Sequence, residues 1–214
     1  MGFEEATPVQ EQAIPPIMEG QDVLACAQTG TGKTAAFLLP VLNELSKESS
    51  DDKVRALIIE PTRELAMQVD QQLEALSYFT PISSIAIYGG RDGHAMEQEK
   101  RALKRGASII VATPGRFTSH MDMGYEDFSG LKYLILDEAD RMLDMGFAPA
   151  IMNIVHKLPL ERQNLLFSAT MPAQIRKFAM QILNGPTKEI NIAISKPAEN
   201  ILQLAYEVED HAKI

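Results

Sequence analysis

The sequence has little cysteine and no long hydrophobic run. Cys26 is the single cysteine among 214 residues, which excludes disulfides within the chain and cysteine-rich zinc sites. Such cysteine usage is typical of a reducing compartment, and we expect a cytoplasmic protein. No stretch of about 18 apolar residues is present, which predicts no membrane span. Glu4 and Glu5 stand where a secretory signal would be basic, so we expect no such signal.

Positive charge is also scarce. The chain has 20 Lys and Arg residues against 29 Asp and Glu residues, a net charge of −9 at pH 7. This balance argues against broad nonspecific nucleic-acid binding, which needs a clustered basic surface. It is compatible with a narrow site built from a few arginines, backbone N–H groups and helix N-termini.

Apolar runs alternate with helical patterns along almost the whole chain. Runs that are apolar apart from an end residue, such as LIIE, SIIVA and YLILD, predict a mainly parallel sheet that is covered on both faces. The predicted strands are 23–27, 56–60, 84–88, 108–112, 133–136, 164–168, 189–193 and 202–208. The predicted helices are 35–45, 62–79, 94–104, 148–158 and 172–183. This alternation predicts a doubly wound α/β fold, in which ligands bind beyond the carboxyl ends of the strands.

A glycine-rich segment follows the first predicted strand and leads into a helix. It consists of Ala27, Gln28, Thr29, Gly30, Thr31, Gly32, Lys33 and Thr34. Strand, loop and helix in this order are the context of a phosphate-binding loop, in which backbone N–H groups and the helix N-terminus face the phosphates. Lys33 would then contact the β- and γ-phosphates, and the Thr34 hydroxyl would bind Mg²⁺. The strict motif has glycine where Ala27 stands, and an ordinary glycine-rich turn is the alternative.

Two acidic residues follow the strand predicted at 133–136. A short apolar strand that ends in Asp137 is typical of the motif that holds Mg²⁺ in nucleotide hydrolases. Glu138 is placed to orient or deprotonate the attacking water. The alternative is that the pair simply caps the next helix. The glycine-rich loop upstream favours the catalytic interpretation.

Three other strand ends combine small or hydroxyl residues with an arginine at a helix start. They are Pro61-Thr62-Arg63, Gly89-Gly90-Arg91 and Thr113-Pro114-Gly115-Arg116. N-terminal amides, hydroxyls and a guanidinium group suit phosphates, although each segment alone is better explained by helix capping with a solvated arginine. Three such segments along one edge of a sheet would form a strip that suits a polynucleotide backbone.

Three further polar residues have weaker signals. Ser168 and Thr170 follow the strand predicted at 164–168 and are placed to hydrogen-bond the carboxylates of Asp137 and Glu138, or to start the next helix in a routine way. The Gln10 amide is able to pair bidentately with adenine, although most glutamines on helix surfaces are solvated.

Taken together, GFEEATPVQ, AQTGTGKT, PTRELA, GG, TPGR, DEAD and SAT occur in the order and spacing of the DEAD-box RNA helicases, which the chain resembles over essentially its whole length. The resemblance implies a RecA-like domain that binds ATP and Mg²⁺, and Ala27 is the family's usual first loop residue. It implies that Gln10 reads adenine and that Ser168 and Thr170 couple the nucleotide state to RNA binding. The implied RNA-backbone contacts are Pro61, Thr62, Arg63, Gly90, Thr113, Gly115 and Arg116.

The sequence also departs from the family pattern. The family has a second RecA-like domain with an arginine finger, and no His-Arg-x-Gly-Arg motif occurs here. We therefore expect an excised first domain: a Q-motif segment at 1–20, the ATP-binding domain at 21–195, and the start of a linker at 196–214. Such a monomeric fragment would bind nucleotide and hydrolyse it negligibly. The alternatives are an ATP-gated RNA clamp, a DNA helicase and a P-loop kinase that acts on a small molecule.

Overall fold

Seven parallel strands form one sheet in the computed structural model, which describes residues 5–47, 53–90, 93–124 and 127–192. The strands are β1 (Asp22–Cys26), β2 (Ala56–Ile59), β3 (Ser84–Ile87), β4 (Ile109–Ala112), β5 (Tyr133–Leu136), β6 (Gln163–Ser168) and β7 (Thr187–Asn191). Their order in the sheet is β3-β4-β2-β5-β6-β1-β7, and every pair of neighbours is parallel. The predicted doubly wound α/β fold is confirmed.

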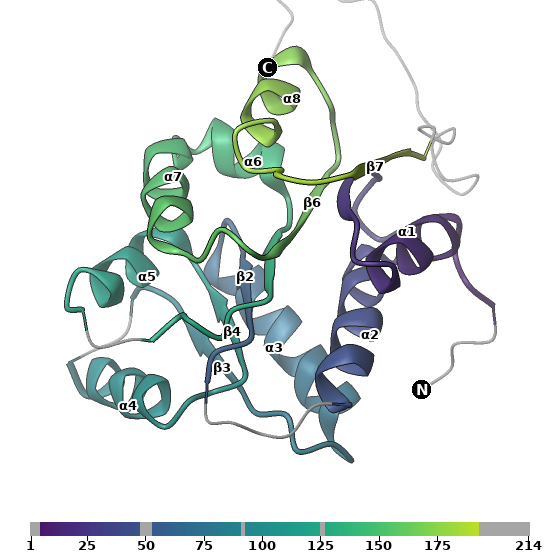
Figure 1. The fold of residues 1–214 in the computed structure, drawn as a ribbon. Coiled ribbons are helices and arrows are strands. Elements are labelled where there is room, and N and C mark those ends of the chain that lie inside the picture. The colour runs from purple at the N-terminus through teal and green to yellow at the C-terminus, as the bar shows by residue number, and fades with distance from the viewer. Residues whose placement is uncertain (1–4, 48–52, 91–92, 125–126, 193–214) are drawn as a thin grey trace, which may run out of the picture.

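Helices cover both faces of this sheet (Figure 1). They are α1 (Pro8–Met18), α2 (Lys33–Ser46), α3 (Arg63–Ser77), α4 (Gly93–Lys104), α5 (Pro114–Met121), α6 (Ala139–Asp144), α7 (Ala148–Lys157) and α8 (Ala173–Ala179). The first three pack on one face and the other five on the opposite face. None of the helices in the described ranges is long and apolar enough to cross a membrane.

The two faces of the sheet explain why β2, β4 and β5 are apolar throughout. In β2, Ala56 and Ile58 belong to the core under α1–α3, whereas Leu57 and Ile59 belong to the core on the other side. Successive side chains of a strand point to opposite faces, so a sheet with helices on both faces needs an apolar residue at every position. The Phe37 and Phe167 rings meet in the first core, with centroids 5.3 Å apart.

Some element boundaries differ from the predictions. Helix α1 was not predicted, because Pro15 and Pro16 interrupt its helical pattern and its carboxyl-terminal turn has no basic residue. The last strand begins at Thr187 rather than at 189. The strand predicted at 202–208 lies outside the described residues.

The strand register aligns four strand ends at one edge of the sheet. Ile87 pairs with Ala112, Ala112 with Ile59, and Ile59 with Leu136. The residues that follow β3, β4, β2 and β5 therefore lie side by side, in that order. These are the segments in which phosphate and magnesium chemistry was predicted.

Candidate nucleotide site and nucleic-acid interface

The glycine-rich loop joins β1 to α2 and depends on two left-handed glycines. Gly30 has φ of +84° and Gly32 has φ of +93°, a region that other residues enter only with strain. Gly32 is also crowded, because a Cβ atom there would lie 2.6 Å from the Gln10 Nε2 atom. The loop thus brings backbone, rather than side chains, to the start of α2.

Gln10 ties α1 to this loop. Its side chain is buried, its Oε1 accepts a hydrogen bond from the Thr7 N–H (3.0 Å), and its Nε2 donates to the Gly32 carbonyl oxygen (3.2 Å). Both ends of the amide are therefore used within the chain. Its predicted contact with adenine stays a prediction, and Gln10 does line the cavity next to the loop.

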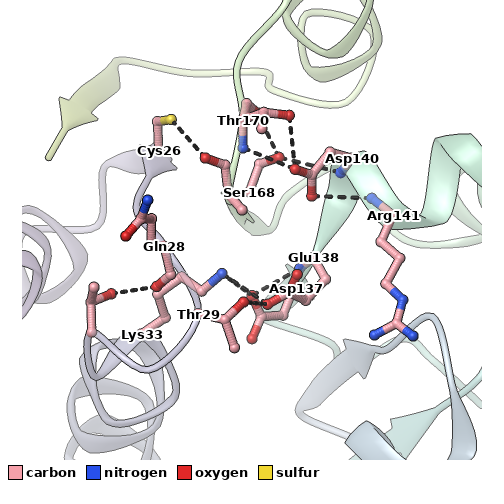
Figure 2. Close-up of polar contacts among 12 residues, drawn as sticks. Cys26, Gln28, Thr29, Lys33, Asp137, Glu138, Asp140, Arg141, Ser168 and Thr170 are labelled. Carbon is pink, nitrogen blue, oxygen red and sulfur yellow. Dashed lines mark hydrogen bonds and ion pairs between the residues drawn. The ribbon is translucent and has the colours of Figure 1, made fainter. Parts of the chain in front are cut away.

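Lys33 lies between the loop and the acidic pair that follows β5. Its Nζ atom is 3.0 Å from the Glu138 Oε1 atom and 3.8 Å from the Asp137 Oδ1 atom, and its side chain is only 4% exposed. The Thr29 hydroxyl donates to the same Glu138 oxygen at 2.8 Å. Figure 2 shows these side chains converging from the loop and from β5. The three residues that were predicted to handle phosphates, metal and water lie together, as expected.

The buried carboxyl groups of this site repel one another, and the pKa values of Asp137 and Glu60 are raised. Burial raises the pKa of Asp137 from 3.8 to about 6, with Lys33 opposing and Glu138 adding to the change. Burial also raises the pKa of Glu60 well above its ordinary value of 4.5, and the charges of Asp137 and Glu138 raise it further. Carboxylates that repel one another in a buried site favour a bound cation.

The backbone at Glu138 is strained. Among non-glycine residues in the described part of the chain, it alone has a positive φ, with φ of 54° and ψ of 46°. A conformation of this kind costs about 1–3 kcal/mol and is common at functional sites. The Asp137 Oδ1 atom accepts the Glu138 N–H at 2.8 Å, which supports the sharp turn. Both carboxylates then line one cavity.

This cavity has a volume of about 620 Å³, within the usual range for small-molecule sites. It extends from the loop along α3, where its lining is largely apolar. Thr34 and Asp137 both line it, and their hydroxyl and carboxylate oxygens are the donors that Mg²⁺ prefers beside nucleotide phosphates. The described ranges contain no cluster of three acidic, histidine or cysteine side chains in metal-binding geometry. The donor set fits a Mg²⁺ ion that is shared with phosphates and water.

Ser168 and Thr170 contact a different carboxylate from the one expected. The Ser168 Oγ atom accepts from the Asp140 N–H (3.3 Å) and donates to the Thr170 carbonyl oxygen (2.7 Å). The Thr170 N–H and hydroxyl donate to the Asp140 Oδ2 atom at 2.9 and 2.8 Å (Figure 2). The expected contacts with Asp137 and Glu138 were wrong, because α6 starts directly beside the end of β6.

These hydrogen bonds also affect the pKa of Asp140. Burial would raise the pKa of its carboxyl group, but hydrogen bonds from Thr170 and Ser168 outweigh burial and lower the pKa. The hydrogen bonds therefore favour the ionised form of Asp140. The hydrogen bonds of Asp140 with Ser168 and Thr170 join the end of β6 to α6, the helix that follows the acidic pair.

The predicted strip lies on neighbouring strands. Pro61 is buried, and Thr62 caps α3 by accepting the Leu65 N–H at its Oγ1 atom (3.3 Å). Arg63 is exposed, and a Cβ atom on Gly90 would lie 3.4 Å from its Nη1 atom, so two of the three segments meet. The remaining segment begins α5: the Thr113 hydroxyl makes no capping bond there, and Gly115 is exposed.

Arg116 differs from Arg63, the exposed arginine of the strip, because it is largely buried. Its side chain is 17% exposed, and its Nε atom donates to the Glu99 Oε2 atom at 2.9 Å. The same oxygen lies 2.8 Å from the Nε2 atom of buried His120. Sequence reasoning missed Glu99, because nothing marks it as buried within the heavily charged pattern of α4.

Comparisons with known proteins agree with this arrangement. Residues 7–178 match the model of the DEAD/DEAH box helicase family. The chain is 48% identical over 186 residues to the ATP-dependent RNA helicase CshA of Listeria monocytogenes, covering 87% of this chain and 35% of that protein. It is 43% identical over 213 residues to the DEAD-box ATP-dependent RNA helicase CshA of Geobacillus kaustophilus, covering 100% of this chain and 44% of that protein.

A solved structure shares the fold. The crystal structure of a DEAD box protein from the hyperthermophile Methanococcus jannaschii superposes with a TM-score of 0.81 at 37% identity, covering 89% of this chain and 50% of that one. The chain thus spans less than half the length of these two curated relatives. It belongs to the DEAD/DEAH box helicase family.

Proposed function

We propose that this chain is the ATP- and RNA-binding portion of an ATP-dependent RNA helicase. The full-length protein would hydrolyse ATP when RNA is bound and open short duplexes. The observation that carries the proposal is the convergence of Lys33, Asp137 and Glu138 beside a glycine-rich loop in one cavity. The RNA helicase names of the relatives support the same assignment.

Binding of the nucleotide would replace the ion pair between Lys33 and Glu138 with contacts between Lys33 and the phosphates. Backbone N–H groups of residues 27–34 would hold the phosphates, and the Lys33 ammonium would leave the Glu138 carboxylate for phosphate oxygens. Glu138 would then be free to orient the attacking water and accept its proton. Thr34 and Asp137 would hold Mg²⁺, which neutralises charge on the phosphates when it is bound. Gln10 would select adenine by its amide.

RNA would bind along the strip of strand ends. Its residues are Pro61, Thr62, Arg63, Gly90, Thr113, Gly115 and Arg116. Hydroxyl, amide and guanidinium donors would contact phosphates and 2′-hydroxyls, so recognition would be largely independent of base sequence. The Asp140 link to Ser168 and Thr170 would connect this edge to the nucleotide site.

The rest of the catalytic site would come from a second RecA-like domain of the full-length protein. An arginine supplied there would stabilise charge at the transferring phosphoryl group, a contribution of about 10³–10⁵ in rate. We therefore expect negligible hydrolysis from the 214-residue chain, which would be a cytoplasmic monomer. Its ATP-binding domain would extend from 21 to 195, between a Q-motif segment at 1–20 and a linker that begins at 196.

Hydrolysis in the full-length protein tests this proposal. We expect RNA to stimulate ATP turnover, and Glu138→Gln to keep ATP binding while turnover is lost. The control is Glu189→Gln, which removes an exposed carboxylate from β7. Turnover that ignores RNA, or wild-type turnover by Glu138→Gln, would overturn the assignment. Equal stimulation by DNA of the same length would indicate a DNA helicase, and ATP-gated binding without unwinding would indicate a clamp.

Nucleotide preference tests the role of Gln10 separately. Competition of ATP and GTP for the chain should favour ATP, and Gln10→Ala should reduce the preference. Equal affinity for the two nucleotides in the wild-type chain would contradict adenine selection by Gln10 and leave the phosphate site unaffected.

A further inference from the structure

Glu60 is a buried carboxylate that the roles above do not use. It directly follows β2, and Asp137 directly follows β5; the last residues of these strands, Ile59 and Leu136, are register partners. The two acidic residues therefore emerge side by side. Ala56 and Ile58 lie on the same face of the sheet as Ile135, so alternation directs Glu60 and Asp137 to the face covered by α2 and α3.

The Glu60 side chain reaches the cavity with one oxygen, Oε1, that has no hydrogen-bond partner among the residues that the structure describes. The residue is 1% exposed and lines the cavity together with Lys33, Asp137 and Glu138. Its Oε1 atom is fully buried and has no hydrogen-bond partner in the described part of the protein. Buried carboxylate oxygens are normally hydrogen-bonded, so an unpartnered one beside a ligand cavity indicates a missing donor.

Charge in the cavity favours a donor that carries positive charge. Three carboxylates, those of Glu60, Asp137 and Glu138, face one ammonium group, that of Lys33. Among the described residues that line the cavity, Lys33 is the single cationic side chain, and its Nζ atom is 3.0 Å from Glu138. A magnesium ion carries two positive charges and usually keeps several bound waters, each of which presents strong hydrogen-bond donors.

We propose that Glu60 positions the magnesium ion of the nucleotide, with its free Oε1 atom accepting a hydrogen bond from a Mg²⁺-bound water. This inference rests on the nucleotide site proposed above. Glu60 does not touch the reacting phosphate; it orients the hydration shell of the ion that Asp137 and Thr34 hold. Partners of this outer kind typically contribute about 10–100-fold to metal affinity.

Binding of ADP to the 214-residue chain, measured by calorimetry in Mg²⁺ and again in EDTA, tests the inference. Glu60→Gln keeps the shape of the side chain and removes its charge. We expect ADP affinity in Mg²⁺ to fall about tenfold and affinity in EDTA not to fall, because the variant removes a negative group near the phosphates. The ratio of the two affinities is thus the diagnostic quantity. A purely structural role would change both affinities alike.

Control variants distinguish a failure of the inference about Glu60 from a failure of the proposed nucleotide site. Glu74→Gln removes an exposed carboxylate of α3 and should leave the ratio at its wild-type value. Glu60→Asp keeps the charge but shortens its reach, and should lower the ratio by less than Glu60→Gln does. If Glu60→Gln does not fold, the comparison of Glu60→Asp with wild type decides, and an unchanged ratio overturns the inference. Failure of the wild-type chain to bind Mg²⁺–ADP would instead overturn the proposed nucleotide site.

Discussion

Replacement of Asp137 by asparagine should stabilise the nucleotide-free chain at neutral pH. Burial raises the pKa of this carboxyl group from 3.8 to about 6. A raised pKa means that the folded chain holds the proton more tightly than the unfolded chain does. Stability is therefore lost as the pH rises from about 4 to about 6, and the loss is complete above that window. The asparagine variant has no such loss.

The magnitude follows from the pKa difference. Each pKa unit is worth about 1.4 kcal/mol, so the difference between 3.8 and about 6 corresponds to about 3 kcal/mol near pH 7. Asparagine keeps an Oδ1 atom to accept the Glu138 N–H, which Asp137 accepts at 2.8 Å. It gives up the 3.8 Å contact with Lys33, while the 3.0 Å contact between Lys33 and Glu138 remains. We expect a net gain of about 1–3 kcal/mol in the free energy of unfolding.

Urea unfolding followed by circular dichroism measures the effect, since the chain has no tryptophan to report by fluorescence. Wild type and Asp137→Asn would be compared without Mg²⁺ or nucleotide at about pH 4.5 and about pH 7.5. The difference between them should be small in acid and should reach its full value at the higher pH. A less stable variant at about pH 7.5, or the same gain at both pH values, would refute the electrostatic reasoning.

Asp22 provides a matched control with the opposite expected sign. This aspartate is also buried, but its carboxylate accepts hydrogen bonds from the Asn164 N–H (2.7 Å), the Asn164 side chain (3.1 Å) and the Asn184 N–H (2.9 Å). Asparagine would turn an NH₂ group toward one of these donors. Asp22→Asn should lower the free energy of unfolding by about 1–3 kcal/mol at neutral pH.

Substitutions at three further positions test other parts of the candidate site and interface. Gly32→Ala should destabilise the chain by more than about 1 kcal/mol in urea unfolding and weaken ADP binding, because it adds left-handed strain and a contact with Gln10; wild-type stability would contradict the loop geometry. Thr170→Val should cost about 1 kcal/mol by removing the hydroxyl bond to Asp140, and Thr170→Ser should restore it. Arg63→Ala should weaken RNA binding to a similar extent for all RNA sequences, as measured by fluorescence anisotropy. The slope of the binding constant against salt concentration should fall by about one phosphate contact. An unchanged slope would show that Arg63 is not part of the RNA interface.

Local patterns were enough to predict most of the fold and to bring the residues of the candidate site to attention. Buried strands of a doubly wound sheet are apolar at every position, so they are recognisable without partners. The loop up to Thr34 depends on glycines at positive φ and on the helix that follows, and both are local properties of the chain. Asp137 and Glu138 follow β5 and lie near Lys33, which agrees with the predicted strand at 133–136. They end a strand, and strand ends meet at one edge of a parallel sheet.

Contacts between distant segments required the tertiary structure. Ser168 and Thr170 contact Asp140 because of the way α6 leaves β5, and no spacing in the sequence reports that angle. Arg116 is anchored by Glu99 because α4 packs beside α5. The surroundings of a charged side chain depend on neighbours that are far away in sequence, whereas hydrophobic periodicity is a property of the segment alone.

Glu60 shows most clearly the difference between what local sequence patterns predict and what the tertiary structure decides. As the last letter of a predicted strand, it carried no functional signal in the sequence. The strand order places β2 beside β5, and this pairing sets Glu60 next to Asp137 in the same cavity. Residue order therefore determined that the chain forms a glycine-rich loop before a helix and an acidic strand end, because each is built from adjacent residues. Only the packing of the sheet decided which carboxylates share a buried space, and so how strongly they interact.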